Sequence, residues 1–202
     1  MGEKPGIKGL KEFFSFPPTK PCISPNPLGW FDPRNAEVLK QNMNKKTALI
    51  VEIGSYFGLS TRYILDNAPN AVVIAIDTWL GSVNEFIIGN REWIDYDKIL
   101  YETFLSSCWD YRERLIPLRL DSINGLRLVH LFGITPELIY LDGSHDTAQV
   151  YADLTTIGEL FPNVKIVGDD WGWESVRKAV EKFALEHGKT IKSNHCVWWF
   201  DG

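Results

Sequence analysis

The sequence of 202 residues has no long apolar run and few cysteines. No stretch approaches the roughly 18 uncharged apolar residues of a transmembrane helix, so we expect no membrane partner. The N-terminal stretch MGEKPGIKGLKEFF lacks the apolar core of a secretory signal peptide. Only Cys22, Cys108 and Cys196 occur, a number and spacing that match neither a zinc signature nor a disulfide framework. These absences favour a reducing compartment, the cytoplasm.

An excess of positive charge is also missing. The 21 lysines and arginines are outnumbered by 26 aspartates and glutamates, which gives a net charge of −5. The longest basic cluster is Lys45-Lys46. Because nucleic-acid backbones are bound by basic surfaces, we expect no nucleic-acid partner and a small-molecule substrate instead.

Proline is concentrated near the N-terminus and sparse elsewhere. Seven of the eleven prolines lie between Pro5 and Pro33. Since proline disrupts helices and ladders, residues 1–46 are predicted to form an extended arm with a short helix near Pro33–Met43. Its aromatic residues leave two alternatives: a flexible leader, or an arm that packs on the domain or on a partner such as a second copy of the chain.

From residue 47 onward, apolar runs alternate with helix-like segments. Continuous apolar strands indicate a parallel sheet that is covered by helices on both faces, and the alternation predicts a doubly wound α/β fold in residues 47–202. KTIKSN and CVWWF at the end predict an antiparallel β-hairpin. The five core strands are predicted at ALIVEIG (48–54), AVVIAID (71–77), RLIPLRL (114–120), LIYLD (138–142) and VKIVGDD (164–170).

Each parallel strand ends at an acidic residue, and ligands of such sheets bind at the carboxyl ends of the strands. The first turn, VEIGSYFGLST, has Gly54 and Gly58 framing a tight loop whose N–H groups can approach an anionic group. Its G-x-x-x-G spacing departs from the G-x-G-x-x-G fingerprint of dinucleotide-binding proteins, which disfavours NAD.

Two of these stretches resemble a known family. The E-I-G-S-x-x-G-x-S-T turn and the IDTWLGS stretch are similar to the first two motifs of class I S-adenosylmethionine-dependent methyltransferases. The resemblance covers roughly residues 47–200 and implies a seven-stranded, Rossmann-like sheet, an S-adenosylmethionine cofactor and methyl transfer.

The resemblance also implies a cofactor site at the strand ends. The Gly54–Gly58 loop would hold the methionine end, Asp77 would accept hydrogen bonds from the ribose hydroxyls, and Asp121 and Ser122 would lie near the adenine. A carboxylate can select a ribose by accepting two hydroxyl donors. The expected cofactor-contacting residues are Glu52, Gly54, Ser55, Gly58, Ser60, Asp77, Thr78, Trp79, Asp121, Ser122 and Asp142.

Three aspartates close the fourth and fifth strands. Asp142, Asp169 and Asp170 should converge, because neighbouring strands lie about 4.8 Å apart. Like charges at that distance favour a hard cation such as Mg²⁺ among them. The stretches LDGSHD and GDDW resemble those of divalent-metal-dependent small-molecule O-methyltransferases of the macrocin and novobiocin types, which implies that these three residues bind the metal.

This resemblance has one departure. Some members of that group carry an acid, taken as the general base, where this sequence has Ser144. His145 is therefore the candidate catalytic base, since an imidazole titrates near neutral pH. Trp79, Trp171 and Trp173 could form walls suited to a sugar face or a flat phenol or catechol acceptor. Residues 78–113, which include Trp93, Tyr96 and Tyr101, are expected to form a lid over the acceptor.

Two other functions stay open at this point. A non-catalytic methyltransferase-like binding protein is compatible with Ser144 and with the proline-rich arm. A hydroxylase-like relative of the same fold would share the strand-end acids.

Overall fold

The computed structural model describes residues 4–25, 31–44, 46–81 and 92–201, with the backbone alone for residues 92–99. One seven-stranded sheet has the order β3-β2-β1-β4-β5-β7-β6, and the first five strands in that order are parallel. This confirms the predicted Rossmann-like sheet with an antiparallel hairpin at its end. The strands are β1 (Leu49–Ile53), β2 (Val72–Asp77), β3 (Leu115–Arg119), β4 (Leu138–Leu141), β5 (Lys165–Gly168), β6 (Thr190–Asn194) and β7 (Val197–Asp201).

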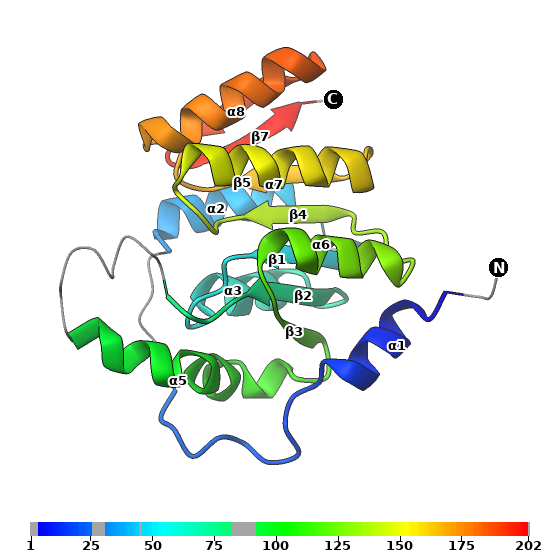
Figure 1. The fold of residues 1–202 in the computed structure, drawn as a ribbon, viewed down its shortest axis with the longest axis vertical. Helices are drawn as coiled ribbons and strands as arrows, with labels where there is room; N and C mark the ends of the chain where they lie inside the picture. Colours follow the sequence, from blue (N-terminus) through cyan, green and yellow to red (C-terminus); the bar gives the residue numbers. More distant parts are fainter. Residues whose placement is uncertain (1–3, 26–30, 45, 82–91, 202) are drawn as a thin grey trace.

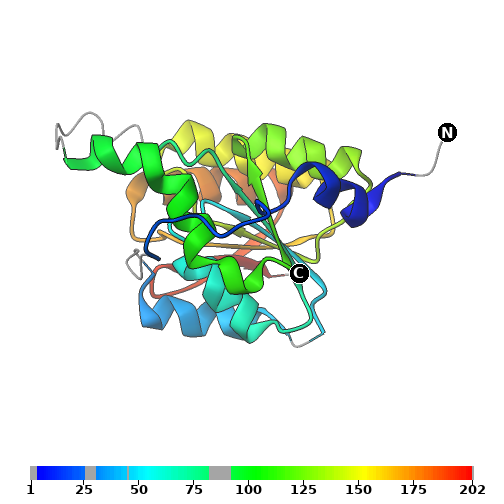
Figure 2. The same ribbon diagram turned by 90° about the horizontal axis from the view of Figure 1, so that it is seen from below.

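Helices cover both faces of the sheet (Figures 1 and 2). One face carries α6 (Ser122–Leu131), α7 (Thr147–Leu160) and α8 (Glu174–His187). The other carries α2 (Pro33–Asn42) and α3 (Leu59–Asn67), and α5 (Glu92–Ser107) packs with them. A short 3-10 helix, η1 (Trp109–Tyr111), follows α5. None of the helices in the described part of the chain has the length and apolar character needed to cross a bilayer.

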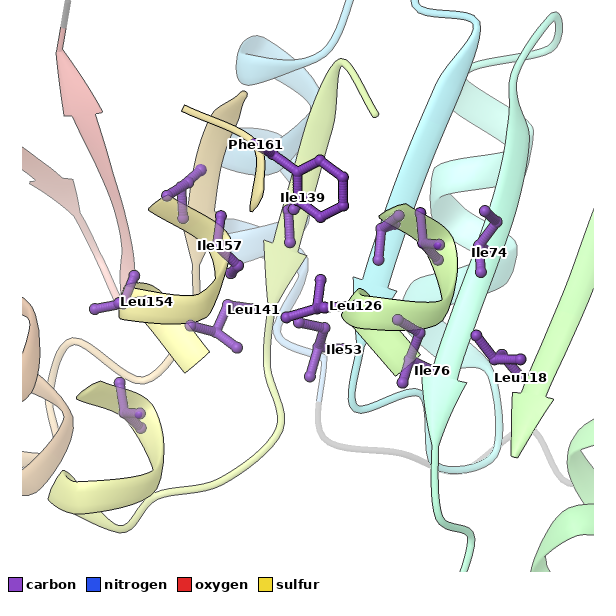
Figure 3. Close-up of a cluster of buried hydrophobic side chains, with 14 of the residues drawn as sticks. Ile53, Ile74, Ile76, Leu118, Leu126, Ile139, Leu141, Leu154, Ile157 and Phe161 are labelled. Carbon is purple, nitrogen blue, oxygen red and sulfur yellow. The ribbon is translucent and has the colours of Figure 1, made fainter. Parts of the chain in front are cut away.

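Alternate residues of the parallel strands enter two separate cores. In β1, Val51 and Ile53 face α6 and α7, whereas Ile50 and the buried carboxyl of Glu52 face the opposite side. Two buried faces explain why these strands are continuous apolar runs in the sequence. Figure 3 shows the first core, with labelled side chains Ile53, Ile74, Ile76, Leu118, Leu126, Ile139, Leu141, Leu154, Ile157 and Phe161.

The prediction of an extended arm was wrong for its first part, which forms helix α1 (Gly6–Phe13). Ile7, Leu10 and Phe14 lie on one helical stripe that packs on the core, and Leu10 is fully buried. The high proline density did not prevent this helix, because no proline lies within it.

The rest of the arm packs along the domain (Figure 2). Ser106 Oγ of α5 donates a hydrogen bond to the backbone oxygen of Ile23 at 2.6 Å. The ring of Phe16 lies edge-on to Trp109, with centroids 5.9 Å apart. Helix α2 begins as predicted, because Asp32 accepts from the backbone N–H of Arg34 at 2.7 Å and proline occupies the first helical position.

Candidate active site

Strained backbone is concentrated at one edge of the sheet. Tyr56, Trp79 and Asp170 have φ values of 45°, 48° and 63°, in the left-handed region that side chains other than glycine rarely occupy. They follow β1, β2 and β5, so all three lie at the carboxyl ends of parallel strands. Such conformations persist where surrounding contacts fix them, commonly at functional sites. This edge is therefore the candidate site.

The glycines of the first turn are required by close packing. Gly54 has a φ of 84°, and a Cβ on it would lie 2.1 Å from the backbone oxygen of Asp142. Gly58, with a φ of 81°, starts α3, and a Cβ there would lie 2.3 Å from Cys108 Sγ. The loop after β1 therefore lies directly against the segment after β4, and the two halves of the edge are joined.

Asp77 holds this loop in place. Its Oδ2 accepts from the backbone N–H groups of Ser55 at 2.8 Å and Tyr56 at 2.9 Å, and its Oδ1 accepts from the N–H of Trp79 at 2.7 Å. The loop amides expected to approach a ligand thus point to Asp77. Because a carboxylate has about four acceptor positions, these three donors do not fill all of them within the described residues.

Glu52 fixes the same loop from within the protein. Its carboxyl group accepts from the hydroxyls of Ser55 and Ser60, both at 2.6 Å, and from that of Thr61. Burial raises the pKa of Glu52 to about 6, although the three hydroxyl donors act in the opposite direction. The expected contact of Glu52 with the cofactor stays a prediction. Sequence reasoning missed Thr61, which the hydroxyl-rich LST stretch could have suggested.

Trp79 lies beneath the edge. It has no exposed surface, and its ring packs against Tyr101 and Phe104 with centroid distances of 4.8 and 4.6 Å. Its Nε1 donates to the backbone oxygen of Tyr56 at 2.9 Å. A contact between Trp79 and a cofactor would require this packing to open.

Asp121, Ser122 and Thr78 make contacts within the protein at or near strand ends. Asp121 caps α6 by accepting from the backbone N–H of Asn124 at 3.0 Å. Ser122 Oγ donates to the buried carboxyl of Asp153 at 2.6 Å. Thr78 Oγ1 accepts from the N–H of Leu80 at 3.3 Å. Asp121 and Thr78 are near the surface at strand ends, where a ligand can reach them.

Asp169 is tied to distant parts of the chain. Its Oδ1 accepts from Asn35 Nδ2 at 2.9 Å and from the N–H of Asp170 at 2.8 Å, and its Oδ2 accepts from the Tyr140 hydroxyl at 2.8 Å. Only 5% of Asp169 is exposed. Burial raises its pKa, while these donors act in the opposite direction. Neither Asn35 nor Tyr140 was predicted. Asn35 could have been found in the sequence, because it is a polar residue on the otherwise apolar stripe of its helix.

Asp170 pairs with the candidate base. His145 Nε2 lies 2.6 Å from Asp170 Oδ2. The imidazole stacks on the indole of Trp173, with an interplanar angle of 15° and centroids 4.6 Å apart. Trp173 is 53% exposed, so the stacked pair borders solvent. The structure therefore brings together His145, Asp170 and Trp173, which sequence reasoning singled out separately.

The carboxyls at this edge affect one another. Burial and the charges of Asp169 and Asp170 raise the pKa of Asp142 well above its usual range. Glu52 and Asp77 contribute in the same direction. A cationic ligand near Asp142 would therefore favour its ionised form.

The three aspartates do not fit a divalent ion as they are arranged. Within the described residues, no group of three or more His, Cys, Asp or Glu side chains is placed to hold a metal. Asp169 accepts from three protein donors and Asp170 pairs with His145.

Comparisons with known proteins agree with this geometry. Residues 51–171, more than half of the chain, match the family model described as "Methyltransferase domain". The chain belongs to this family. It is a class I S-adenosylmethionine-dependent methyltransferase, as the motifs at the first two strand ends predicted.

Solved structures share the fold of this methyltransferase at low sequence identity. A proposed caffeoyl-CoA O-methyltransferase from Staphylococcus aureus has 14% identity and a TM-score of 0.60, with 87% of this chain and 86% of that one covered. The calicheamicin methyltransferase CalS11 has 15% identity and a TM-score of 0.58, with coverage of 82% and 76%. Fibrillarin in its complex with Nop5p has 18% identity and a TM-score of 0.53, with 90% of each chain covered. None of the curated proteins matches the sequence.

The cofactor fits the residues present. S-adenosylmethionine carries a ribose and two positively charged groups, an ammonium and a sulfonium. Within the described residues, the three donors on Asp77 leave room on its carboxylate for a hydroxyl donor. Asp142, whose ionisation is suppressed by neighbouring acids, is suited to a cationic group.

Proposed function

We propose that the methyltransferase acts on a hydroxyl of a small molecule, with His145 as the catalytic base. The observation that carries this proposal is the 2.6 Å pair between His145 Nε2 and Asp170 Oδ2 at the edge that also holds the glycine loop. An imidazole oriented by a carboxylate is a common arrangement for removing a hydroxyl proton.

The roles of the residues follow from their positions. Asp170 accepts the Nε2 proton of His145, which fixes the ring and makes Nδ1 the basic nitrogen. His145 would take the proton of the acceptor hydroxyl as that oxygen becomes methylated, and S-adenosylhomocysteine would be the other product. The bound cofactor supplies an electrophilic methyl group on a sulfonium. Asp77 and the glycine loop contribute positioning.

The charge of the edge and its exposed ring favour a small acceptor over a polyanion. The chain carries a net charge of −5, and acids surround the site, which disfavours a polyanion such as RNA. The exposed indole of Trp173 offers a flat apolar surface beside His145. A sugar face or a phenol or catechol ring suits such a surface. CalS11 is described as a TDP-rhamnose 3′-O-methyltransferase, which makes nucleotide sugars a sensible group to test.

A divalent metal, the second half of the sequence-based expectation, stays a prediction. Within the described residues, Asp142, Asp169 and Asp170 are not arranged to hold a metal, so Mg²⁺ at this place would need these side chains to rearrange. No step of the proposed reaction is assigned to a metal.

Three further expectations belong to this proposal. Residues 78–113 would cover the acceptor, although 82–91 and the side chains of 92–99, including Trp93 and Tyr96, lie outside the described residues. The arm could also contact a second copy of the chain, forming a homodimer. Free Cys22, Cys108 and Cys196 agree with a reducing compartment such as the cytoplasm.

The test is release of S-adenosylhomocysteine from S-adenosylmethionine with a panel of catechols and nucleotide sugars. Wild type, His145→Gln and the control His187→Gln are compared, with Mg²⁺ and with EDTA. His187 stacks on Phe183 in α8, away from the site. We expect turnover of at least one acceptor, lost in His145→Gln and kept in the control. Full turnover by His145→Gln would contradict the assignment of the base. Turnover that is lost in EDTA and regained with Mg²⁺ would support the expected metal site.

A further inference from the structure

Asn35 is a buried polar residue that joins three separated segments. Only 6% of it is exposed, and it lies on the face of α2 that otherwise buries Val38 and Leu39. Its Nδ2 donates to Asp169 Oδ1 at 2.9 Å, and its Oδ1 accepts from the N–H of Cys196 at 3.3 Å. An amide that uses both ends in a core position has a specific structural role.

The contact continues to the candidate base. Asp169 Oδ1, which accepts from Asn35, also accepts from the N–H of Asp170 at 2.8 Å. Asp170 has a left-handed backbone with a φ of 63°, and its carboxylate lies 2.6 Å from His145 Nε2. The direction of the Asp170 side chain therefore depends on a backbone conformation that Asp169 helps to hold.

The other partners of Asp169 come from both sides of the sheet, Tyr140 from the core that α2 covers and Trp198 from the opposite core. The Tyr140 hydroxyl donates to Oδ2 at 2.8 Å, and the ring of Phe31, just before α2, lies edge-on to Tyr140 at 6.4 Å. Trp198 Nε1 donates to the backbone oxygen of Asp169 at 2.8 Å. Asn35 is the one among these donors that comes from the N-terminal arm, outside the residues 51–171 that the family model matches.

We propose that Asn35 is a positioning residue: through Asp169 it holds Asp170 in the orientation that aligns the His145 imidazole. The N-terminal arm is then part of the active site and is not a separable leader. The consequence for catalysis rests on the proposed role of His145 as base, whereas the effect on the ring itself does not.

The test uses the ring signals of histidine in nuclear magnetic resonance spectra of the full chain. The sequence has four histidines, and the signals of His145 are identified by their loss in His145→Gln. Asn35→Ala removes the amide, and Asn35→Ser is a smaller change that keeps a polar group but shortens its reach. Asn42→Ala is the matched control, because Asn42 lies on the same helix and its Nδ2 donates to the backbone oxygen of Val38 at 2.9 Å.

We expect both Asn35 variants to shift the His145 ring signals while those of His130 and His187 stay at their wild-type positions. Asn42→Ala should leave all of these signals unchanged. His145 signals that stay at the wild-type position in a folded Asn35 variant would overturn the proposal. If Asn35→Ala does not fold, the His145 signals of Asn35→Ser provide the test of the proposal.

Activity gives the second readout. With an acceptor from the panel, Asn35→Ala should lower kcat by about 10- to 100-fold, as expected for a misplaced base, with unchanged affinity for S-adenosylmethionine. Unchanged kcat together with shifted His145 signals would uphold the positioning role and contradict His145 as base. Loss of cofactor affinity in Asn35→Ala, with kcat preserved, would contradict the proposal.

Discussion

The two halves of the strand-end edge use acids in different ways. After β1 and β2, Glu52 and Asp77 accept from donors of the adjoining loops, such as Ser55 and Tyr56. After β5, Asp169 accepts from Asn35, 134 positions away in the sequence, and from Tyr140, 29 positions away. The first half is built largely around one turn of the chain, whereas the second exists only once the whole domain has folded.

Under the proposed function, this difference would separate cofactor binding from proton removal. The β1–β2 half offers a remaining acceptor position on Asp77 and a rigid loop, which suit cofactor binding. The half formed by β4, β5 and α2 holds the His145–Asp170 pair, which suits proton removal. Substitutions in the two halves should therefore affect different measured quantities.

The largest effect is expected from Asp170→Asn, which removes the carboxylate beside His145. We expect kcat to fall by about 10²- to 10⁴-fold, the usual contribution of general base catalysis, with cofactor affinity unchanged. Steady-state kinetics and calorimetry measure the two quantities. Asp201→Asn, at an exposed position in β7, is the control. An Asp170→Asn enzyme with wild-type kcat would show that the pair has no catalytic part.

Asp77→Ala tests the cofactor half. The variant loses the acceptor of the loop amides and the position for a ribose hydroxyl, so affinity for S-adenosylmethionine should fall by about 10- to 100-fold. Calorimetric titration measures the change. Asp66→Ala, in which an exposed contact with the Tyr111 hydroxyl is lost, should retain wild-type affinity. Equal affinity of the two variants for S-adenosylmethionine would show that Asp77 does not contribute to cofactor binding.

The buried carboxyl of Glu52, in the β1–β2 half, makes the stability of the protein depend on pH. Its pKa is raised from 4.5 to about 6, so its contribution to stability is fully present below pH 4.5 and is lost as pH rises through about 6. The difference corresponds to about 2 kcal/mol in the free energy of unfolding. Urea unfolding between pH 4.5 and 7 should show this decline in wild type, and the decline should be smaller in Glu52→Gln, in which the other raised carboxyls still contribute. Parallel pH profiles of the two proteins would contradict the raised pKa.

The smallest effect is expected from Trp173→Ala. The exposed indole stacks on His145, and such ring pairs are worth about 0.5–1.5 kcal/mol, so a reduction of kcat/KM by a factor of a few is expected. Leu185→Ala, an exposed apolar position in α8, serves as control for a change of surface area. If KM for the acceptor rises while kcat stays constant, Trp173 contacts the acceptor and does not orient the His145 ring.

The contrast between local contacts and contacts of distant segments also explains which features could be predicted from the sequence. The strands, the glycine turn and the acids that close the strands follow from local patterns, since hydrophobic runs and glycine positions are read within a few residues. Helix α1 was missed because proline density outweighed the stripe of Ile7, Leu10 and Phe14. The partners of Asp169 could not be predicted, because no local pattern brings α2 beside β5. For the same reason, the sequence could not show that Asp169, one of the three expected metal ligands, accepts hydrogen bonds from Asn35 and Tyr140.

The most direct test of the separation between binding and chemistry is calorimetric titration of S-adenosylmethionine, in EDTA, into wild type, Asp77→Ala and Asp170→Asn. We expect a saturable isotherm for wild type, the same affinity for Asp170→Asn and clearly weaker binding for Asp77→Ala. Equal weakening in both variants, or no binding by wild type without a metal, would contradict it.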